Sequence, residues 1–346
     1  MIKEIHEQPL VAQKILSASE EIYKKASDMI LRSDKVLIIG SGSSYHAGLL
    51  IDLLMKKIPL LSYAFISSEY ENAIDLVDSR STVIAISQSG FTSDTLEAVK
   101  KFRERGCSLI AVTNVIDSPL AKLSDHTIYI EAGVEEAVTA TKSFTGQVLS
   151  LLRVYLEIIK ALGRDYSILE RDLQRTPHVM KNHINLSEIQ IRGLVDLIYT
   201  KSNMYVLGRG LNYAIALESA LKLKEACSIH AEALSLSEVR HGPKTVVDES
   251  FAVGMILGSE KDLQIATRVI EEIKDSNAHI VVVAPENLSD RFSESGLIST
   301  IRVSTVSSDI INSLLNLIVF QQLAYYTAIS RLLDPDYPKR LGKIVF

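Results

Sequence analysis

The sequence predicts an α/β protein with two tandem, doubly wound parallel sheets, each in a three-layer α/β/α arrangement. Short, continuous apolar runs alternate with segments of helical periodicity, which is typical of parallel strands that are buried on both faces. The alternation occurs twice in the 346 residues, with similar spacing between corresponding strands, and this indicates a duplicated unit. Small hydroxyl residues follow the two leading strands of the first copy, at the sheet edge where ligands bind in such folds.

The composition narrows the possible functions. With 47% hydrophobic residues the chain can bury a sizeable core, and a formal net charge of −5 argues against partnership with nucleic acid or an anionic membrane. The two cysteines, Cys107 and Cys227, have no metal-ligand spacing, so we expect reduced thiols, no metal and no cofactor. Residues 1–9 lack the apolar core of a signal peptide, and no apolar run reaches about 18 residues. We therefore expect a soluble cytoplasmic protein.

The first copy of the unit is expected at residues 1–162. Its helices are expected at 8–32, 45–55, 94–105 and 145–162, where apolar residues recur with a helical period. Its buried strands are expected at 35–39, 82–86, 107–112 and 127–130.

The second copy is expected at residues 191–330, after a more polar connector at 163–190 and before a C-terminal tail at 331–346. A helix is expected at 216–226 and a buried helix at 310–329. The buried strands are expected at 203–207, 251–257, 279–283 and 300–303.

A phosphate site is indicated by the loops that follow the first two strands. The segment from Ser87 to Thr92 opens a helix, so its backbone N–H groups can attract an anion and the hydroxyls, including that of Ser89, can add donors. Residues 40–44, Gly-Ser-Gly-Ser-Ser, follow the other leading strand. Neither loop has a Walker lysine or the third glycine of a dinucleotide loop, so a phosphate monoester fits better than a nucleotide. Ordinary N-capping by serine and threonine is the alternative.

A second group of polar residues lies on the helix expected at 216–226. Glu218, Lys222 and Glu225 recur at spacings of four and three, so they share one helix face. His241 follows, directly before a Gly-Pro turn. A carboxylate, an amine and an imidazole held together can move protons between an aldose and a ketose. A solvated helix with surface salt bridges is the alternative.

Stretches spread over the whole chain match one protein family. They are Lys3–Ile5, Glu7–Pro9, Gly42–Tyr45, Ser87–Thr92, Glu135 with Thr141–Thr145, Glu218–Pro243 and Leu341–Lys343. No single stretch is specific, but together they are. On these residues the chain resembles the isomerase half of glutamine–fructose-6-phosphate amidotransferase, a pair of flavodoxin-like sugar-isomerase (SIS) domains.

The resemblance implies roles for individual residues in catalysis. Glu225 matches the base that moves a proton between C1 and C2 of the sugar. His241 matches the histidine that opens the sugar ring, which the neighbouring subunit supplies in this family. Lys343 matches the lysine of a tail that closes the site, contacts the open-chain carbonyl and can form a Schiff base.

The resemblance also implies which residues bind the substrate. The expected phosphate ligands are Ser43, Ser44, Ser87, Gln88, Ser89 and Thr92. The sugar is expected to be lined by the side chains of Glu135, Lys222 and Glu218 and by the backbone of Val138 and Gly342.

The chain departs from the amidotransferase pattern in ways that affect the reaction. The match begins at Met1 with no glutaminase domain, so we expect no ammonia production from glutamine by this chain alone. Phe91 stands where the amidotransferase loop usually has glutamate, and Gly42-Ser43 stands where it commonly has Gly-Thr. A stand-alone pair of SIS domains is similar to the isomerising hexosamine-phosphate deaminases.

The leading hypothesis is therefore an isomerising deaminase that converts glucosamine 6-phosphate and water to fructose 6-phosphate and ammonia through an enediol or enolamine. The first alternative is the isomerase (synthase) component of a glucosamine–fructose-6-phosphate aminotransferase, which uses free ammonia or a separate glutaminase subunit. Further alternatives are a related sugar-phosphate isomerase or deglycase, and a sugar-phosphate-binding regulator without catalysis. The resemblance implies a homodimer whose active site is shared across the interface.

Overall fold

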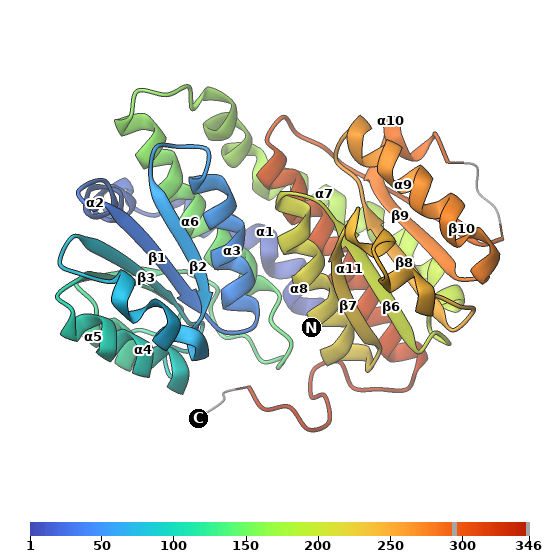
Figure 1. The fold of residues 1–346 in the computed structure, drawn as a ribbon, viewed down its shortest axis with the longest axis horizontal. Coiled ribbons are helices and arrows are strands. Elements are labelled where there is room, and N and C mark those ends of the chain that lie inside the picture. The colour runs from blue at the N-terminus through green and yellow to red at the C-terminus, as the bar shows by residue number, and fades with distance from the viewer. Residues whose placement is uncertain (293–295, 344–346) are drawn as a thin grey trace. The chain divides into compact units, whose positions relative to one another are not determined.

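The computed structural model describes residues 1–292 and 296–343. The chain divides into two compact units, each built around its own sheet (Figure 1). The N-terminal unit comprises residues 7–135, 140–177 and the tail from residue 342. The C-terminal unit comprises residues 1–6, 136–139 and 178–341. Short segments from each end of the chain thus belong to the unit built by the opposite half.

The N-terminal unit is a parallel sheet with the strand order β2-β1-β3-β4-β5. The second strand of this order, β1, pairs with both of its neighbours, so that Lys35 lies opposite Leu61 of β2 and Ser81 of β3. The strands are β1 (Lys35–Gly40), β2 (Leu61–Ile66), β3 (Ser81–Ile86), β4 (Ser108–Thr113) and β5 (His126–Tyr129).

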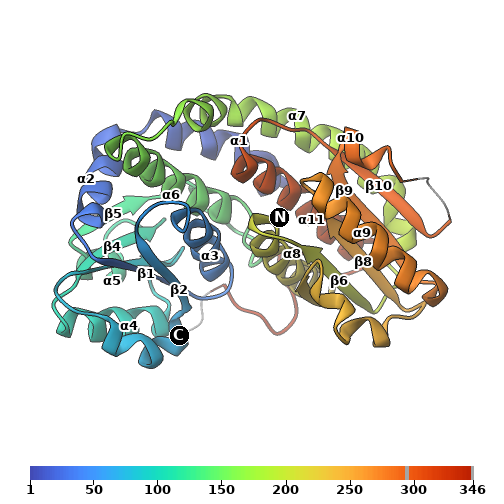
Figure 2. The same ribbon diagram turned by 45° about the horizontal axis from the view of Figure 1, so that its top comes forward.

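Helices cover both faces of this sheet (Figure 2). On one face, Phe102 packs with Leu37 and Val83 in an apolar cluster. On the other face, Ile38 and Ile86 lie so close to Gly48 that a Cβ there would collide with Ile38. The first face carries α4 (Ser93–Glu104), α5 (Pro119–Leu123) and η1 (Ser67–Leu76), and the second carries α2 (Glu20–Leu31), α3 (Ser43–Met55) and α6 (Lys142–Ala161).

The C-terminal unit repeats the same topology. Its order is β10-β9-β8-β6-β7, which is the order of the N-terminal unit when it is read from β7. The strands are β6 (Asn203–Gly208), β7 (His230–Ser235), β8 (Phe251–Ile256), β9 (His279–Pro285) and β10 (Ile298–Val303). The helices and turns are α8 (Leu211–Cys227), η2 (Glu238–Arg240), η3 (Pro243–Val246), α9 (Glu260–Ile273), η4 (Lys274–Ser276), α10 (Glu286–Ser289) and α11 (Asp309–Ser330).

The shared strand order confirms the predicted pair of doubly wound parallel sheets, and each strand predicted from an apolar run is present within a few residues. Two strands were not predicted, β2 and β7. Both lie at the edge of their sheet and expose several of their residues, whereas every residue of β3 and β8 is buried. Edge strands of mixed exposure lack the fully buried apolar run of β3 and β8, so the pattern finds them less consistently: it found β5 and β10 but not β2 and β7.

Most of the stretch expected as a connector at 163–190 is helical. It lies in the long helix α7 (Ser167–Ile198), which contains Pro177. The buried helix α11 packs against α8, where Asn212 Oδ1 accepts hydrogen bonds from Ser313 and Asn316 at 3.1 Å each. These bonds satisfy polar side chains inside the core and fix the start of α8.

In the part of the chain that the structure describes, no helix is both long and apolar enough to cross a membrane.

Candidate active site

The hydroxyl-rich loops lie side by side at the carboxyl edge of the N-terminal sheet. Gly40, the last residue of β1, pairs with Ile86, the last residue of β3, so the loops that follow these strands start next to each other. The strand order reverses between β1 and β3, because β2 lies on the other side of β1. Ligands of open α/β sheets bind at such a switch point.

The loop after β3 is held by its own hydroxyl groups. Ser87 Oγ accepts the backbone N–H of Gly90 at 3.0 Å and lies 2.9 Å from Thr92 Oγ1. Ser89 Oγ accepts the N–H of Phe91 at 3.1 Å. Gly90 has a φ of +69°, which a side chain would strain, and a Cβ there would collide with the side chain of Ser118. The loop therefore presents three hydroxyls at the start of α4 in one defined arrangement.

The loop after β1 contributes Ser43 and Ser44 at the start of α3. The Ser44 hydroxyl is nearly buried and accepts a hydrogen bond of 2.9 Å from Nε2 of Gln147 on α6. A Cβ on Gly40 would collide with the backbone of Ser44, so glycine is needed where the strand turns into the helix. The predicted phosphate ligands of the two loops thus belong to one unit and one sheet edge.

A cavity of about 590 Å³ in the N-terminal unit includes part of this edge. Gln88 and Ser89 line it together with Glu135 and Lys343, so a phosphate-loop segment and the C-terminal lysine share one cavity. Gln88 is fixed through its carbonyl oxygen, which accepts the N–H of Asn114 at 3.0 Å. The remaining lining residues are Asn114, Val115, Ile116, Tyr129, Glu131, Gly133 and Val134.

Glu135 and Lys343 form an ion pair in this cavity, in which the carboxylate is fully buried and the Lys343 side chain is 28% exposed. Lys343 Nζ lies 3.0 Å from Glu135 Oε2, and the carboxylate also accepts the N–H groups of Thr141 and Ser143 and the Ser143 hydroxyl. Burial alone would raise the pKa of Glu135, but the Lys343 ammonium and these hydrogen bonds outweigh it and lower the pKa. Glu135 is therefore an anchored carboxylate that holds Lys343.

The catalytic group predicted on α8 lies in the C-terminal unit. Lys222 is fully buried, and its Nζ lies 3.2 Å from Glu218 Oε1 and 2.7 Å from Glu225 Oε2. Burial alone would lower the pKa of Lys222, but the two carboxylates raise it above its usual value. Glu218 is also fully buried, whereas the Glu225 side chain is 17% exposed. Of the two carboxylates, Glu225 is the one that a ligand can reach.

His241 ends the short turn η2 in the same unit and is exposed. The turn is attached to α9 by Glu272, whose carboxylate lies 2.8 Å from Arg240 Nε and 2.6 Å from Lys244 Nζ. These two hydrogen-bonded cations lower the pKa of Glu272 to about 2. The segment that carries His241 is therefore fixed while its imidazole faces solvent.

The structure places the predicted site residues in two groups. The phosphate ligands, Glu135, Gly342 and Lys343 belong to the N-terminal unit, and Glu218, Lys222, Glu225, His241 and Val138 belong to the C-terminal unit. The Val138 N–H, predicted to face the sugar, donates to the carbonyl of Asp336 at 2.9 Å. Among the described residues, no three His, Cys, Asp or Glu side chains gather as a metal centre would require.

Two residues that support the site were not predicted from the sequence. Gln147 contacts Ser44, as described above. Asn114 fixes the loop before Glu135, because its side chain donates to the Gly133 carbonyl at 2.6 Å and accepts the Ala132 N–H at 3.1 Å. Asn114 follows β4 directly, so the rule that found the phosphate loops, polar residues after buried strands, also points to it.

The corresponding loops of the C-terminal unit are filled by a side chain of the protein. Asp262 Oδ2 accepts the Gly258 N–H at 3.1 Å and the Ser259 hydroxyl at 2.8 Å at the start of α9. Asp262 Oδ1 accepts a 2.6 Å hydrogen bond from Arg209, which follows β6. The Asp262 carboxylate thus accepts the hydrogen bonds that the start of α9 could offer to a bound anion. At the corresponding place in the N-terminal unit, the start of α4 presents hydroxyl groups instead.

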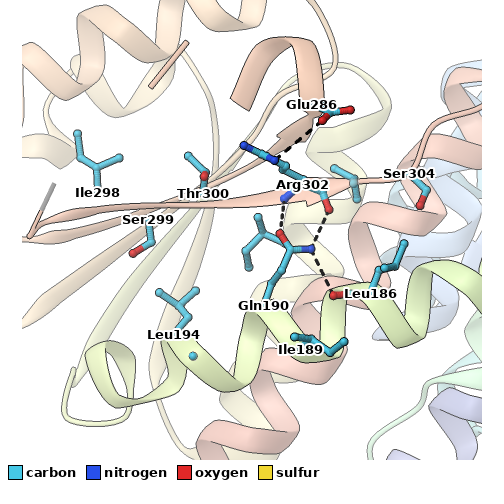
Figure 3. Close-up of a pocket in the computed structure, with 13 residues that line it drawn as sticks. Leu186, Ile189, Gln190, Leu194, Glu286, Ile298, Ser299, Thr300, Arg302 and Ser304 are labelled. Carbon is cyan, nitrogen blue, oxygen red and sulfur yellow. Dashed lines mark hydrogen bonds and ion pairs between the residues drawn. The ribbon is translucent and has the colours of Figure 1, made fainter. Parts of the chain in front are cut away.

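A further cavity of about 880 Å³ lies between α7 and the edge strand β10 (Figure 3). Gln190 extends from α7 to β10, where its carboxamide accepts the Arg302 N–H at 2.9 Å and donates to the Arg302 carbonyl at 3.2 Å. The side chain makes the bonds that a neighbouring strand would make. None of the predicted site residues is among the described residues that line this cavity.

Comparisons with known proteins show the family to which the chain belongs. A model of the SIS domain matches residues 29–156 and 197–331. The glutamine–fructose-6-phosphate aminotransferase (isomerizing) of Pyrobaculum aerophilum is 38% identical over 346 residues, which is 100% of this chain and 57% of that protein. The C-terminal domain of glucosamine-fructose-6-phosphate aminotransferase from Francisella tularensis superposes with a TM-score of 0.88 at 29% identity, covering 97% of both chains.

A second solved structure is similar over nearly its whole length. Glucosamine-6-phosphate deaminase from Thermotoga maritima superposes with a TM-score of 0.80 at 27% identity, covering 99% of this chain and 98% of that chain. The family model, the sequence relatives and the structures point to the same family. The chain belongs to the SIS-domain family and carries two SIS domains in tandem.

Proposed function

We propose that the chain is an aldose–ketose isomerase of amino-sugar phosphates, the isomerase component of a glucosamine–fructose-6-phosphate aminotransferase. The observation that carries the proposal is the cavity that Gln88 and Ser89 share with Lys343, because it joins a phosphate loop to an amine that can meet a carbonyl. The relatives named as aminotransferases support the reaction. The chain spans 57% of the length of the first of them, and we propose free ammonia or a separate glutaminase as its nitrogen source.

The described contacts suit the roles that the resemblance implies. The hydroxyls of both loops bind the phosphate and set its distance from Lys343. Glu135 holds the Lys343 ammonium, which polarises the open-chain carbonyl or, after losing a proton, attacks it as an amine. Glu225 moves the proton between C1 and C2, and Lys222 at 2.7 Å orients its carboxylate.

We also propose a homodimer in which His241 serves the site of the second copy and opens the sugar ring. The exposed imidazole on a fixed turn supports this role, because a second copy can reach it without rearrangement of the turn.

The proposal is tested with the purified chain and fructose 6-phosphate in the presence of an ammonium salt. We expect glucosamine 6-phosphate to form, and the proton at C2 of glucosamine 6-phosphate to exchange with solvent. No product and no exchange would overturn the proposal in favour of a sugar-phosphate-binding regulator. Interconversion of glucose 6-phosphate and fructose 6-phosphate without incorporation of ammonia would indicate a plain isomerase.

Deamination of glucosamine 6-phosphate is the second candidate. The structural similarity to the deaminase from Thermotoga maritima, with a TM-score of 0.80 at 27% identity, favours it. The two reactions share one transition state, so rates with free ammonia in the two directions are linked by the equilibrium constant and do not separate them. A glutaminase supplied in trans does separate them. If it raises amination from glutamine while an enzymatic trap removes free ammonia, the chain receives ammonia directly and is a synthase component.

A further inference from the structure

Gln147 makes a buried contact with the phosphate site that the roles above do not use. It lies on α6 in the N-terminal unit, and its side chain is 1% exposed. Nε2 donates to Ser44 Oγ at 2.9 Å, while the buried Oε1 has no hydrogen-bond partner among the described residues. Buried amide oxygens are normally paired, so the unpaired oxygen needs an explanation.

The hydrogen-bonding capacity of the Ser44 hydroxyl explains why the Gln147 amide is oriented with its nitrogen, and not its oxygen, toward Ser44. The Ser44 hydroxyl has a single proton and two lone pairs. In the observed arrangement the Gln147 N–H occupies a lone pair, so the proton is free to point elsewhere. In the reversed arrangement Oε1 would accept that proton, and Ser44 could only accept hydrogen bonds. A phosphate oxygen is an acceptor, so only the observed arrangement lets Ser44 bind it.

We propose that Gln147 is a positioning residue of the phosphate site: by donating to Ser44 Oγ it directs the Ser44 proton to the substrate phosphate. The inference rests on the proposed function, because it takes Ser44 as a phosphate ligand. It adds a residue on α6, which follows β5, to a site otherwise built from the two loops at the ends of β1 and β3.

The C-terminal unit contains a matched glutamine–serine pair in which the hydrogen bond runs in the opposite direction. Gln322 is also a fully buried helical glutamine in contact with a buried serine, Ser187. Here the serine donates, at 2.7 Å to Gln322 Oε1, and Gln322 Nε2 donates to the Ile184 carbonyl at 2.9 Å. Both amide atoms are paired, so this glutamine has a packing role and serves as the control.

The test measures KM for fructose 6-phosphate and competitive inhibition by inorganic phosphate. In Gln147→Met, we expect KM and the phosphate inhibition constant to rise about tenfold, with kcat within about twofold of the parent. Gln322→Met is expected to lower thermal stability and to leave both constants unchanged. In Ser44→Ala, a further Gln147→Met change should have no additional effect on phosphate inhibition, because Gln147 acts through Ser44.

Gln147→Glu gives a readout that a packing role would not produce. An ionised glutamate accepts the Ser44 proton and repels phosphate, whereas a protonated glutamate can donate. Relative to the parent at each pH, phosphate inhibition should therefore be weakest at high pH and recover as pH falls. If Gln147→Met does not fold, this pH profile still tests whether Gln147 directs the Ser44 proton to the phosphate.

Three outcomes separate the two proposals. Parent-like phosphate inhibition in Gln147→Met, with weakened inhibition in Ser44→Ala, overturns the role of Gln147 and leaves the phosphate site intact. Parent-like inhibition in both variants overturns the assignment of Ser44, and with it this part of the proposed function. Additive effects in the double variant show that Gln147 does not act through Ser44.

Discussion

Lys343 Nζ lies 3.0 Å from Glu135 Oε2, so a lysine of the C-terminal tail is attached to the loop that precedes α6. Glu135 is itself anchored by the first backbone N–H groups of that helix region, on Thr141 and Ser143. A lowered pKa keeps Glu135 ionised at neutral pH. The tail is thereby held at the cavity by a charge that the helix N-terminus stabilises.

This relationship predicts that Glu135 controls the mobility of the tail. Glu135→Gln keeps the shape and the hydrogen-bonding oxygen but removes the charge that holds Lys343. We expect trypsin to cleave the tail about tenfold faster in this variant, because a charge-assisted hydrogen bond is lost. The matched control is Glu131→Gln, an exposed carboxylate that lines the same cavity. Equal cleavage rates in Glu135→Gln and the parent would show that another contact holds the tail.

The proposed proton transfer predicts a specific loss in Glu225→Gln. Glutamine preserves the shape and removes the base, so kcat should fall about 10²-fold or more while the melting temperature changes little. Exchange of the substrate C2 proton with solvent should disappear in parallel. Glu232→Gln, at an exposed position on β7, is the control and should retain both activities. If Glu225→Gln still exchanges the C2 proton at close to the parent rate, the base lies elsewhere in the chain.

The buried His183 predicts an acid-sensitive stability in the C-terminal unit. Nε2 donates to the Leu315 carbonyl at 2.9 Å and Nδ1 accepts the Ser304 N–H at 3.5 Å, so both ring nitrogens have partners in the neutral form. Burial lowers the pKa of His183 from 6.5 to about 4. Between these values the unfolded chain binds a proton that the folded chain does not, so the stability contributed by neutral His183 is lost as pH falls from 6.5 toward 4.

The loss is expected to reach roughly 3 kcal/mol, the equivalent of the shift in pKa. The free energies of unfolding of the parent and of His183→Gln are measured between pH 7 and pH 4 by urea titration, monitored by circular dichroism. The loss is the difference between the two proteins in how this free energy changes with pH. The control is His178→Gln, an exposed histidine of the same helix, α7. A parent and a His183→Gln variant with the same pH dependence would contradict the prediction.

The proposed sharing of His241 predicts complementation between inactive chains. Separate His241→Ala and Glu225→Ala proteins should each be inactive. When they are unfolded together and refolded, mixed dimers contain one site with both residues intact. We expect up to about a quarter of the parent activity, because about half of the dimers are mixed and each has one functional site of two. Mixed dimers shown by mass spectrometry to be present but inactive would exclude the sharing of His241 across an interface.

Much of the fold can be predicted from the sequence, because strands that are buried on both faces appear as short, continuous apolar runs. The runs that became β1, β3, β6 and β8 are apolar at nearly every position, since helices cover both sides of each sheet. The phosphate loops are also local, because their hydroxyls follow those strands directly. Edge strands give a weaker apolar pattern, because part of each is exposed, and two of the four, β2 and β7, were not predicted.

The sequence by itself therefore determined the two sheets, the loops that follow their strands and the shared face of Glu218, Lys222 and Glu225. Only the tertiary structure decided what each polar residue contacts. Gln147 is 103 residues from Ser44 along the chain, and Lys343 is 208 residues from Glu135. Such pairs have no periodic signal, because each is made by the packing of one element against another and depends on the direction of every side chain around it.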